Sequence, residues 1–315
     1  MEENTEQRVD LTLFSEKIQE LKDRIASVIV GQEQTVDLVL TAILANGHVL
    51  IEGVPGVAKT LLARLTARLI DADFSRVQFT PDLMPSDVLG TTVFNMKTNG
   101  FDFHQGPIFA DIVLVDEINR APAKTQAALF EVMEERQISI DGTTHRMGDL
   151  YTILATQNPV EQEGTYKLPE AQLDRFLMKI TMDYPSLEEE VNILERHHTN
   201  AALVKLDDIT PAITKEELLS LRAFMNQVFV DRTLLQYIAL IVQQTRTSKA
   251  VYLGASPRAS VAMLQSSKAY ALLQGRDFVT PEDIKFVAPY VLQHRLILTA
   301  EAEMEGYSPV KVTQR

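Results

Sequence analysis

The residues best suited to chemistry form one short segment, which runs from Gly53 to Thr60 and reads GVPGVAKT. An apolar run precedes it and a helical pattern follows it, which is the context that makes a phosphate-binding loop credible. Its glycines let the backbone curl so that successive N–H groups point at a phosphate, and the helix N-terminus adds positive potential. Lys59 would reach the β- and γ-phosphates, and the Thr60 hydroxyl would ligate Mg²⁺. The segment therefore predicts binding of ATP with magnesium.

Ala58 departs from the strict phosphate-loop pattern, which has glycine at that position. Alanine is tolerated there only if its φ is negative, as it would be at the start of a helix. We therefore expect a negative φ at Ala58 and keep the assignment.

Two adjacent carboxylates end the next apolar run, which covers residues 112–115. Such an uninterrupted run is typical of a strand buried on both faces. Asp116 and Glu117 should then stand at the carboxyl edge of the sheet, beside the phosphate loop. Asp116 would hold Mg²⁺ through its water shell, and Glu117 would orient and deprotonate the attacking water. An acidic pair that merely ends a strand is common, but after a phosphate loop it favours ATP hydrolysis.

Three further polar residues are candidates to act on the terminal phosphate. Asn158 follows the strand pattern at 151–155 and would contact the γ-phosphate and the attacking water. Arg175 and Arg258 would neutralise charge that develops in the transition state. Either arginine alone would more often be a surface salt-bridge partner, so their assignment depends on the whole set.

Strands and helices alternate in the first part of the chain. Apolar patterns predict strands at 48–51, 76–79, 112–115, 151–155 and 178–182. Strands that alternate with helices indicate a parallel sheet covered by helices on both sides. After Tyr184-Pro185 the patterns are helical, and none indicates a strand: they cover 188–198, 215–228, 232–245, 256–273 and 281–298. We expect two domains, an α/β core over residues 1–200 and an all-α domain over 201–315.

Two turn dipeptides interrupt this plan, Asn99-Gly100 near residues 93–104 and Asp141-Gly142 near 137–147. Both suit a two-residue turn, because its two central positions take positive φ. Each dipeptide therefore predicts a β-hairpin. From the residues alone, decoration of the sheet edge and a functional role are equally good interpretations of either hairpin.

Composition narrows the class of protein. The 315 residues are 45% hydrophobic and carry a net charge of −13, which argues against broad, sequence-independent binding to nucleic acid. There is no cysteine, so disulfides and thiolate metal sites are excluded. The first ten residues are polar and acidic, unlike a signal peptide, and the longest apolar runs are too short to span a bilayer. We expect a cytoplasmic protein without membrane insertion.

Four motifs together closely resemble those of the MoxR family of AAA+ ATPases. They read GVPGVAKT at 53–60, VDEINRA at 115–121, ATQNP at 155–159 and LDRF at 173–176. The resemblance spans roughly Val28 to Ala259, and this family often carries alanine where Ala58 stands. It implies an Mg²⁺-dependent ATPase with a five-stranded core in the order 5-1-4-3-2, a C-terminal helical lid and a ring, expected to be a hexamer.

The resemblance also assigns roles residue by residue. Lys59 and Thr60 match the Walker A motif, and Asp116 and Glu117 match Walker B. Asn158 matches sensor 1, Arg175 the arginine finger and Arg258 sensor 2. Relatives carry an extra helix that displaces the lid, so whether Arg258 acts on its own subunit's nucleotide stays open. Nucleotide contacts are implied for Val30, Gly31, Gln32, Gly53, Val54, Pro55, Gly56, Val57, Ala58, Lys59, Thr60 and Leu61. The two hairpins match the helix-2 insert and the pre-sensor-1 hairpin, which favours a role in a pore or in partner binding.

The family's role resembles that of a chaperone. It remodels or activates client proteins, often with a partner that bears a von Willebrand factor A domain, and in some cases helps metal insertion or complex maturation. The alternative is the motor subunit of a metal chelatase or of a DNA-acting AAA+ machine. A DNA motor should have basic hairpin tips, and one lysine, Lys97, is weak support. A module that binds nucleotide without hydrolysing it is the third hypothesis, and Glu117 argues against it.

Overall fold

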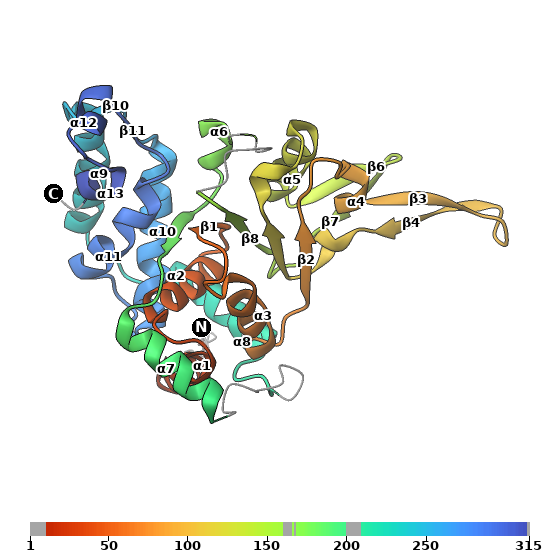
Figure 1. The fold of residues 1–315 in the computed structure, drawn as a ribbon, viewed down its shortest axis with the longest axis horizontal. Helices are drawn as coiled ribbons and strands as arrows, with labels where there is room; N and C mark the ends of the chain where they lie inside the picture. The colour runs from red at the N-terminus through yellow and green to blue at the C-terminus, as the bar shows by residue number, and fades with distance from the viewer. Residues whose placement is uncertain (1–10, 160–165, 167, 200–208, 314–315) are drawn as a thin grey trace, which may run out of the picture.

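The computed structural model describes residues 11–159, 166, 168–199 and 209–313. The polar first ten residues and the expected domain boundary at 200/201 lie outside the described residues. A central sheet carries helices on both faces, and one β-hairpin projects far from the rest of the molecule (Figure 1). No helix among the described residues is both long and apolar enough to cross a membrane.

Five parallel strands form the central sheet, in the order β2-β5-β8-β1-β9. They are β1 (Val49–Gly53), β2 (Phe74–Gln78), β5 (Ile112–Asp116), β8 (Thr152–Gln157) and β9 (Met178–Met182). Counted along the core and taken from the β9 edge, this is the order 5-1-4-3-2 that the resemblance implies. Val49 pairs with both Leu154 and Met178 in parallel, so the amino ends of the strands lie together along one side of the sheet and their carboxyl ends along the opposite side.

Alternating side chains of the strands enter two separate apolar cores. In β5, Ile112 and Leu114 pack in one core, and Val113 and Val115 pack in the other. The first core contains α1 (Leu11–Val28), α2 (Glu33–Leu44) and α3 (Lys59–Leu69), and the second contains α5 (Ala123–Glu135). This two-sided burial is the reason that the run at 112–115 is apolar at every position.

Shorter elements complete the first part of the chain. They are α4 (Pro85–Leu89), α6 (Glu170–Leu173), α7 (Leu187–His198) and the 3₁₀ turns η1 (Pro107–Phe109) and η2 (Ile118–Arg120).

A β-hairpin is present at each turn dipeptide, but only one has the expected turn. Between β6 (Gln137–Ile140) and β7 (Thr143–Arg146), Asp141 and Gly142 have φ of 49° and 78°, as a two-residue turn requires. Between β3 (Gly90–Asn95) and β4 (Gly100–Gln105), Gly100 is itself paired with Asn95, so the loop has four residues. Asn99 alone takes the positive φ there, and the prediction of a two-residue turn at Asn99-Gly100 is wrong.

The C-terminal part is mainly helical, and it joins the first core because α10 packs on α2. Its helices are α8 (Lys215–Phe224), α9 (Arg232–Thr247), α10 (Pro257–Leu273), α11 (Pro281–Leu292), α12 (Ala300–Met304) and α13 (Pro309–Thr313), with the 3₁₀ turn η4 (Met225–Gln227). An antiparallel pair, β10 (Val251–Leu253) and β11 (Ile297–Leu298), was not expected. The last long helix therefore ends at Leu292 and not at Leu298. Strands this short are below the length at which apolar alternation is informative.

Candidate active site

The phosphate loop joins the end of β1 to the start of α3. Gly56 has φ of +89°, and a Cβ added there would meet nothing within 4 Å, so the crest of the loop faces open space. Ala58 has φ of 60° and stands immediately before the first residue of α3. The expectation of negative φ at Ala58 is wrong. The chain makes a left-handed turn to enter the helix, and Ala58 lies outside the helix, where helical φ is not required. An alanine in this conformation costs about 1–2 kcal/mol.

Lys59 lies across the mouth of the loop. Its Nζ donates hydrogen bonds to the carbonyls of Gly53 (2.5 Å) and Val54 (3.0 Å). Burial lowers the pKa of Lys59, and the carboxylates of Asp116 and Glu117 oppose that shift. The ammonium is therefore close to both acids and to the backbone that would cradle a phosphate. Thr60 follows as the second residue of α3.

Asp116 ends β5 and Glu117 follows it directly, at the predicted place, and several polar groups hold them. Oδ2 of Asp116 pairs with Nε of Arg76 (2.6 Å), and Oδ1 accepts a hydrogen bond from the Thr156 hydroxyl (3.1 Å). The Thr156 hydroxyl in turn accepts from the backbone N–H of Glu117 (3.0 Å). Glu117 has φ of 56°, and the chain therefore turns away immediately after the strand.

The Glu117 carboxylate is held from two sides. Its Oε2 accepts a hydrogen bond from Gln78 (2.7 Å) and pairs with Nη1 of Arg120 (3.1 Å). No role was predicted for Arg76, Gln78 or Thr156. Arg76 and Gln78 alternate on β2, and β2 pairs with β5, so the strand register could have indicated them.

Asn158 follows β8 directly, and β8 lies between β5 and β1. Because parallel strands end at one edge, Asn158 leaves the sheet between the acids and the phosphate loop. The structure thus brings together Lys59, Thr60, Asp116, Glu117 and Asn158, as predicted.

The segment Val30-Gly31-Gln32 joins α1 to α2 and lies against the start of α7. Gly31 has φ of +72°, which favours glycine, and a Cβ there would lie 2.2 Å from Oε1 at the flexible end of the Glu189 side chain. Since α7 follows β9, this segment lies near the same carboxyl edge of the sheet as the phosphate loop. The Glu189 side chain caps the start of α7, where it accepts a hydrogen bond from the backbone N–H of Ser186 (2.7 Å).

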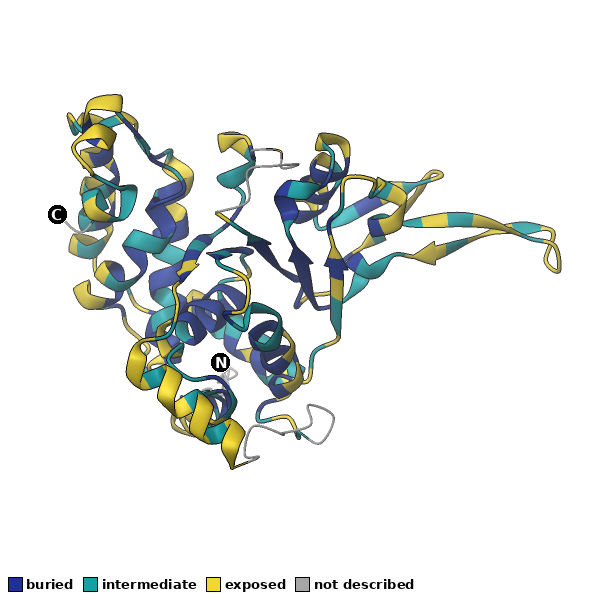
Figure 2. Cartoon of the chain, viewed as in Figure 1, coloured by how far each residue is buried: buried dark blue, intermediate teal, exposed yellow. Residues whose placement is uncertain are grey.

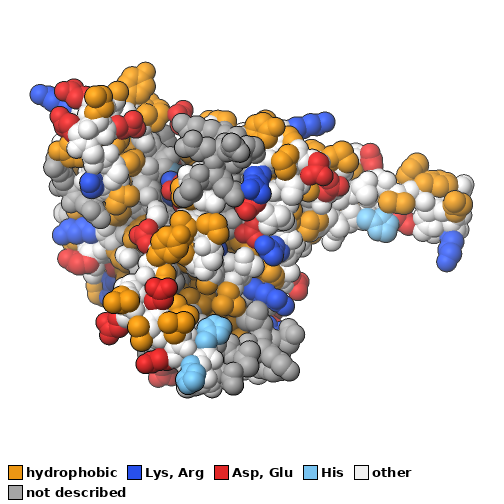
Figure 3. All heavy atoms as spheres, viewed as in Figure 1, with side chains coloured by type: hydrophobic (Ala, Val, Ile, Leu, Met, Phe, Trp, Pro, Cys, Tyr) orange, Lys and Arg blue, Asp and Glu red, His pale blue; other side chains and the backbone are white. Residues whose placement is uncertain are grey.

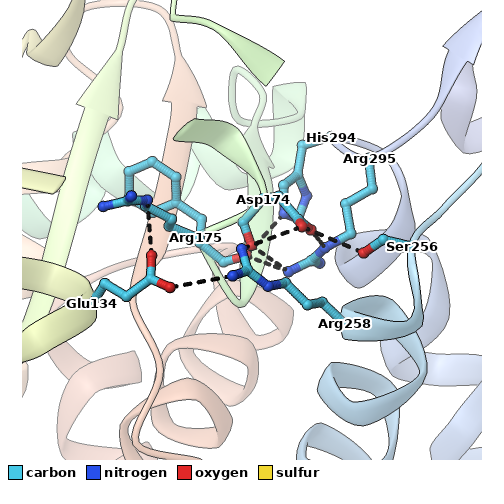
Figure 4. A network of polar contacts seen from close by, with 8 residues as sticks. Glu134, Asp174, Arg175, Ser256, Arg258, His294 and Arg295 are labelled. Atoms are coloured by element: carbon cyan, nitrogen blue, oxygen red, sulfur yellow. Dashed lines mark hydrogen bonds and ion pairs between the residues drawn. The ribbon is translucent and has the colours of Figure 1, made fainter. Parts of the chain in front are cut away.

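Arg175 and Arg258 lie elsewhere. Arg175 precedes β9, whose first residue pairs with the first residue of β1, whereas the phosphate loop follows the last residue of β1. Five residues at about 3.3 Å each place about 16 Å between those edges. Arg175 and Arg258 both pair with Glu134, near the end of α5, at 3.0 Å and 3.2 Å (Figure 4). We refer to this side as the arginine edge and to the other as the phosphate edge. Within one chain, neither arginine reaches the acids.

The donors at the phosphate edge suit a hard divalent cation. A carboxylate and a hydroxyl are the oxygen ligands that Mg²⁺ takes from a protein when phosphates and waters supply the rest. Among the described residues, no group of three or more His, Cys, Asp or Glu could hold a metal alone. The residues therefore fit a magnesium ion that arrives with nucleotide, which Thr60 would ligate and Asp116 would hold through its water shell.

Two family models match the chain. One describes the ATPase family associated with various cellular activities (AAA) and matches residues 48–178, and the other describes the AAA lid domain and matches residues 243–315.

Relatives match over most of the chain. The uncharacterised protein YeaC of Bacillus subtilis is 49% identical over 90% of this chain and 88% of its own length. Chaperone MoxR1 of Mycobacterium tuberculosis is 45% identical over 92% of this chain and 78% of its own. Protein MoxR of Methylorubrum extorquens is 30% identical over 93% of this chain and 91% of its own length.

A solved structure has the same fold. The crystal structure of a candidate ATPase from Cytophaga hutchinsonii superposes with a TM-score of 0.88 at 41% identity, covering 96% of this chain and 94% of its own. The five-stranded core, the match to the AAA lid domain and these relatives agree: the chain belongs to the MoxR family of AAA+ ATPases.

Proposed function

We propose that this protein hydrolyses ATP with Mg²⁺ at a site shared between adjacent subunits of a ring, a hexamer by resemblance, and uses the energy to remodel client proteins. One observation carries the shared site. The base, the phosphate loop and Asn158 lie at the phosphate edge, and both arginines lie at the arginine edge of the same chain. A head-to-tail ring brings the arginine edge of one subunit against the phosphate edge of the next.

At the phosphate edge, each residue acts on a different part of the reaction. The loop N–H groups and Lys59 bind the β- and γ-phosphates, and Asn158 contacts the γ-phosphate and the attacking water. Glu117 orients that water and takes its proton. When bound, Mg²⁺ neutralises charge on the β- and γ-phosphate oxygens.

At the arginine edge, a guanidinium offers paired N–H donors to the γ-phosphate of the neighbouring subunit as charge develops. Arg175 is the arginine finger in this proposal. Arg258 lies beside it on the shared Glu134, so we propose that it also acts on the neighbour's nucleotide and not on its own.

The projecting β3–β4 hairpin favours a protein client over DNA. Its outer part exposes Val93, Phe94, Met96 and Phe101, and the last two are 89% and 74% exposed. Figure 3 shows hydrophobic side chains along the projection and basic charge near its tip. Exposed apolar surface of this kind binds apolar segments of proteins, whereas DNA binding requires clustered basic groups. The client and any partner with a von Willebrand factor A domain follow from resemblance alone.

The shared site is tested by dilution. The rate of ATP hydrolysis per subunit should fall towards zero at concentrations where sedimentation shows only monomer, and Arg175→Ala should be inactive at every concentration. A rate per subunit that is independent of concentration, in samples that contain only monomer, would contradict the proposal.

A further inference from the structure

Arg175 is held in one orientation by α5. Its Nε pairs with Oε2 of Glu134 (3.0 Å), and its Nη1 donates a hydrogen bond to the carbonyl of Phe130. Among the residues that the structure describes, none accepts a hydrogen bond from its Nη2. Two of the three nitrogens thus fix the guanidinium, and the third remains for an acceptor that comes from outside the chain.

Arg258 shares the same carboxylate. It stands in the first turn of α10, and its Nη2 lies 3.2 Å from Oε1 of Glu134. Its Nη1 lies 3.9 Å from Oδ2 of Asp174, the residue before Arg175. The two oxygens of Glu134 therefore each hold one guanidinium, one from the α/β core and one from the helical part (Figure 4).

Arg295 fixes the backbone that carries Arg175. Its side chain is 4% exposed, and its Nε pairs with Oδ1 of Asp174 at 2.6 Å. Its Nη groups donate to the carbonyls of Asp174 (3.2 Å), Phe176 (2.7 Å) and Leu177 (3.1 Å). Because Arg295 follows α11, the position of the helical part is coupled to the segment on which Arg175 stands.

Like charges repel, and the Glu134 carboxylate offsets the repulsion between the two guanidiniums that it binds. Glu134 is partly exposed, with 38% of its side chain accessible, and an ion pair at such a site adds little to stability. Its contacts therefore matter for geometry more than for folding.

We propose that Glu134 is a positioning residue that holds Arg175 and Arg258 as one unit, aimed at the triphosphate bound by the neighbouring subunit. Arg295, through its contacts with Asp174, fixes the position of this unit relative to the helical part. The inference rests on the shared site proposed above. In it, Glu134 touches neither nucleotide nor water and acts only through the two arginines.

The test is Glu134→Gln, which keeps the shape but removes the charge that binds both guanidiniums. We expect kcat to fall by about 10- to 100-fold, because a small misplacement of a catalytic group lowers the rate by about that much. KM for ATP and ring assembly should stay unchanged, because the subunit's own phosphate edge is untouched. Glu135→Gln is the matched control, since Glu135 is the next residue of α5, is exposed and pairs with no other described residue. It should retain wild-type kcat.

Mixing Glu134→Gln with Glu117→Gln gives a second test, in which recovery of activity is not expected if Glu134 only stabilises the fold. Glu134→Gln subunits keep their base, and Glu117→Gln subunits keep an ordered arginine pair, so mixed rings should be more active than either variant alone. A wild-type or raised kcat in Glu134→Gln, or a mixture without recovery, would overturn the positioning role. If Arg175→Ala is inactive while Glu134→Gln is normal, only this inference fails. If Arg175→Ala has the wild-type rate, the shared site itself fails.

Discussion

The phosphate edge and the arginine edge of the sheet hold their charged groups in different ways. At the phosphate edge, backbone loops and neighbouring strands hold the charged groups. Lys59 is bound to loop carbonyls, and Asp116 is bound to Arg76 and Thr156. At the arginine edge, side chains from the core and the helical part meet on Glu134 and Asp174. One edge is thus set by local chain geometry, and the other depends on how two parts of the molecule pack. In the proposed mechanism, each edge supplies part of the ATPase site.

Removal of the ammonium at the phosphate edge should have the largest effect. Lys59→Ala should abolish ATP binding in isothermal titration, because the loop then lacks its phosphate-directed cation. Arg64→Ala, which removes an exposed cation from the same helix, should bind ATP normally. Wild-type affinity in Lys59→Ala would overturn the phosphate-loop assignment.

Removal of the base alone should separate binding from turnover. Glu117→Gln should bind ATP yet hydrolyse it on the order of 10²-fold more slowly or worse, the usual range for loss of a general base. Titration and a phosphate-release assay measure the two effects. Turnover within a few-fold of wild type would mean that another residue activates water.

Acid should loosen the arginine edge through buried histidines. Burial lowers the pKa of His48 to about 3, and His48 bonds Met133 and Ile153 beside that edge. Since the folded pKa lies below the unfolded value near 6.5, this contribution to stability is full above about pH 6.5 and is lost as pH falls towards 3. Between about pH 6.5 and pH 5 the free energy of unfolding should fall by about 2 kcal/mol from His48.

Urea unfolding at several pH values measures this loss, to which His294 adds in the same direction, because burial also lowers its pKa. His48→Gln should reduce the pH dependence, and the exposed His198→Gln should not. An unchanged slope in His48→Gln would contradict the assignment.

The smallest effect concerns the strained loop residue. Ala58→Gly should raise the free energy of unfolding by up to about 1 kcal/mol, because glycine takes positive φ freely but is more flexible when unfolded. ATP binding should be kept. Ala127→Gly, within α5, should instead lower stability by a similar amount. Clear destabilisation by Ala58→Gly in urea titrations would show that the left-handed conformation carries no strain.

Features that depend on neighbouring residues in sequence were the easiest to predict. The phosphate loop, the acids and the Asp141-Gly142 turn follow from local preferences, and the order of the strands followed from family resemblance. Ala58 was predicted wrongly because its φ is set by the turn into α3 and not by the helix itself. Arg76 could have been found only from the register of β2 against β5. Thr156 and Glu134 could not be predicted, because their partners lie about 40 residues or more away and meet them only through packing.

The shared site is tested most directly by mixing two inactive variants. Arg175→Ala should bind ATP and assemble but hydrolyse poorly, since such a finger is worth about 10³-fold or more in rate. Glu117→Gln should be equally inactive because it lacks the base. In an equal random mixture, about one quarter of the head-to-tail interfaces combine an intact base with an intact finger. We therefore predict recovery of about one quarter of the wild-type rate. A mixture that stays inactive, although native mass spectrometry shows mixed rings, would contradict Arg175 as the finger that acts on the neighbouring subunit.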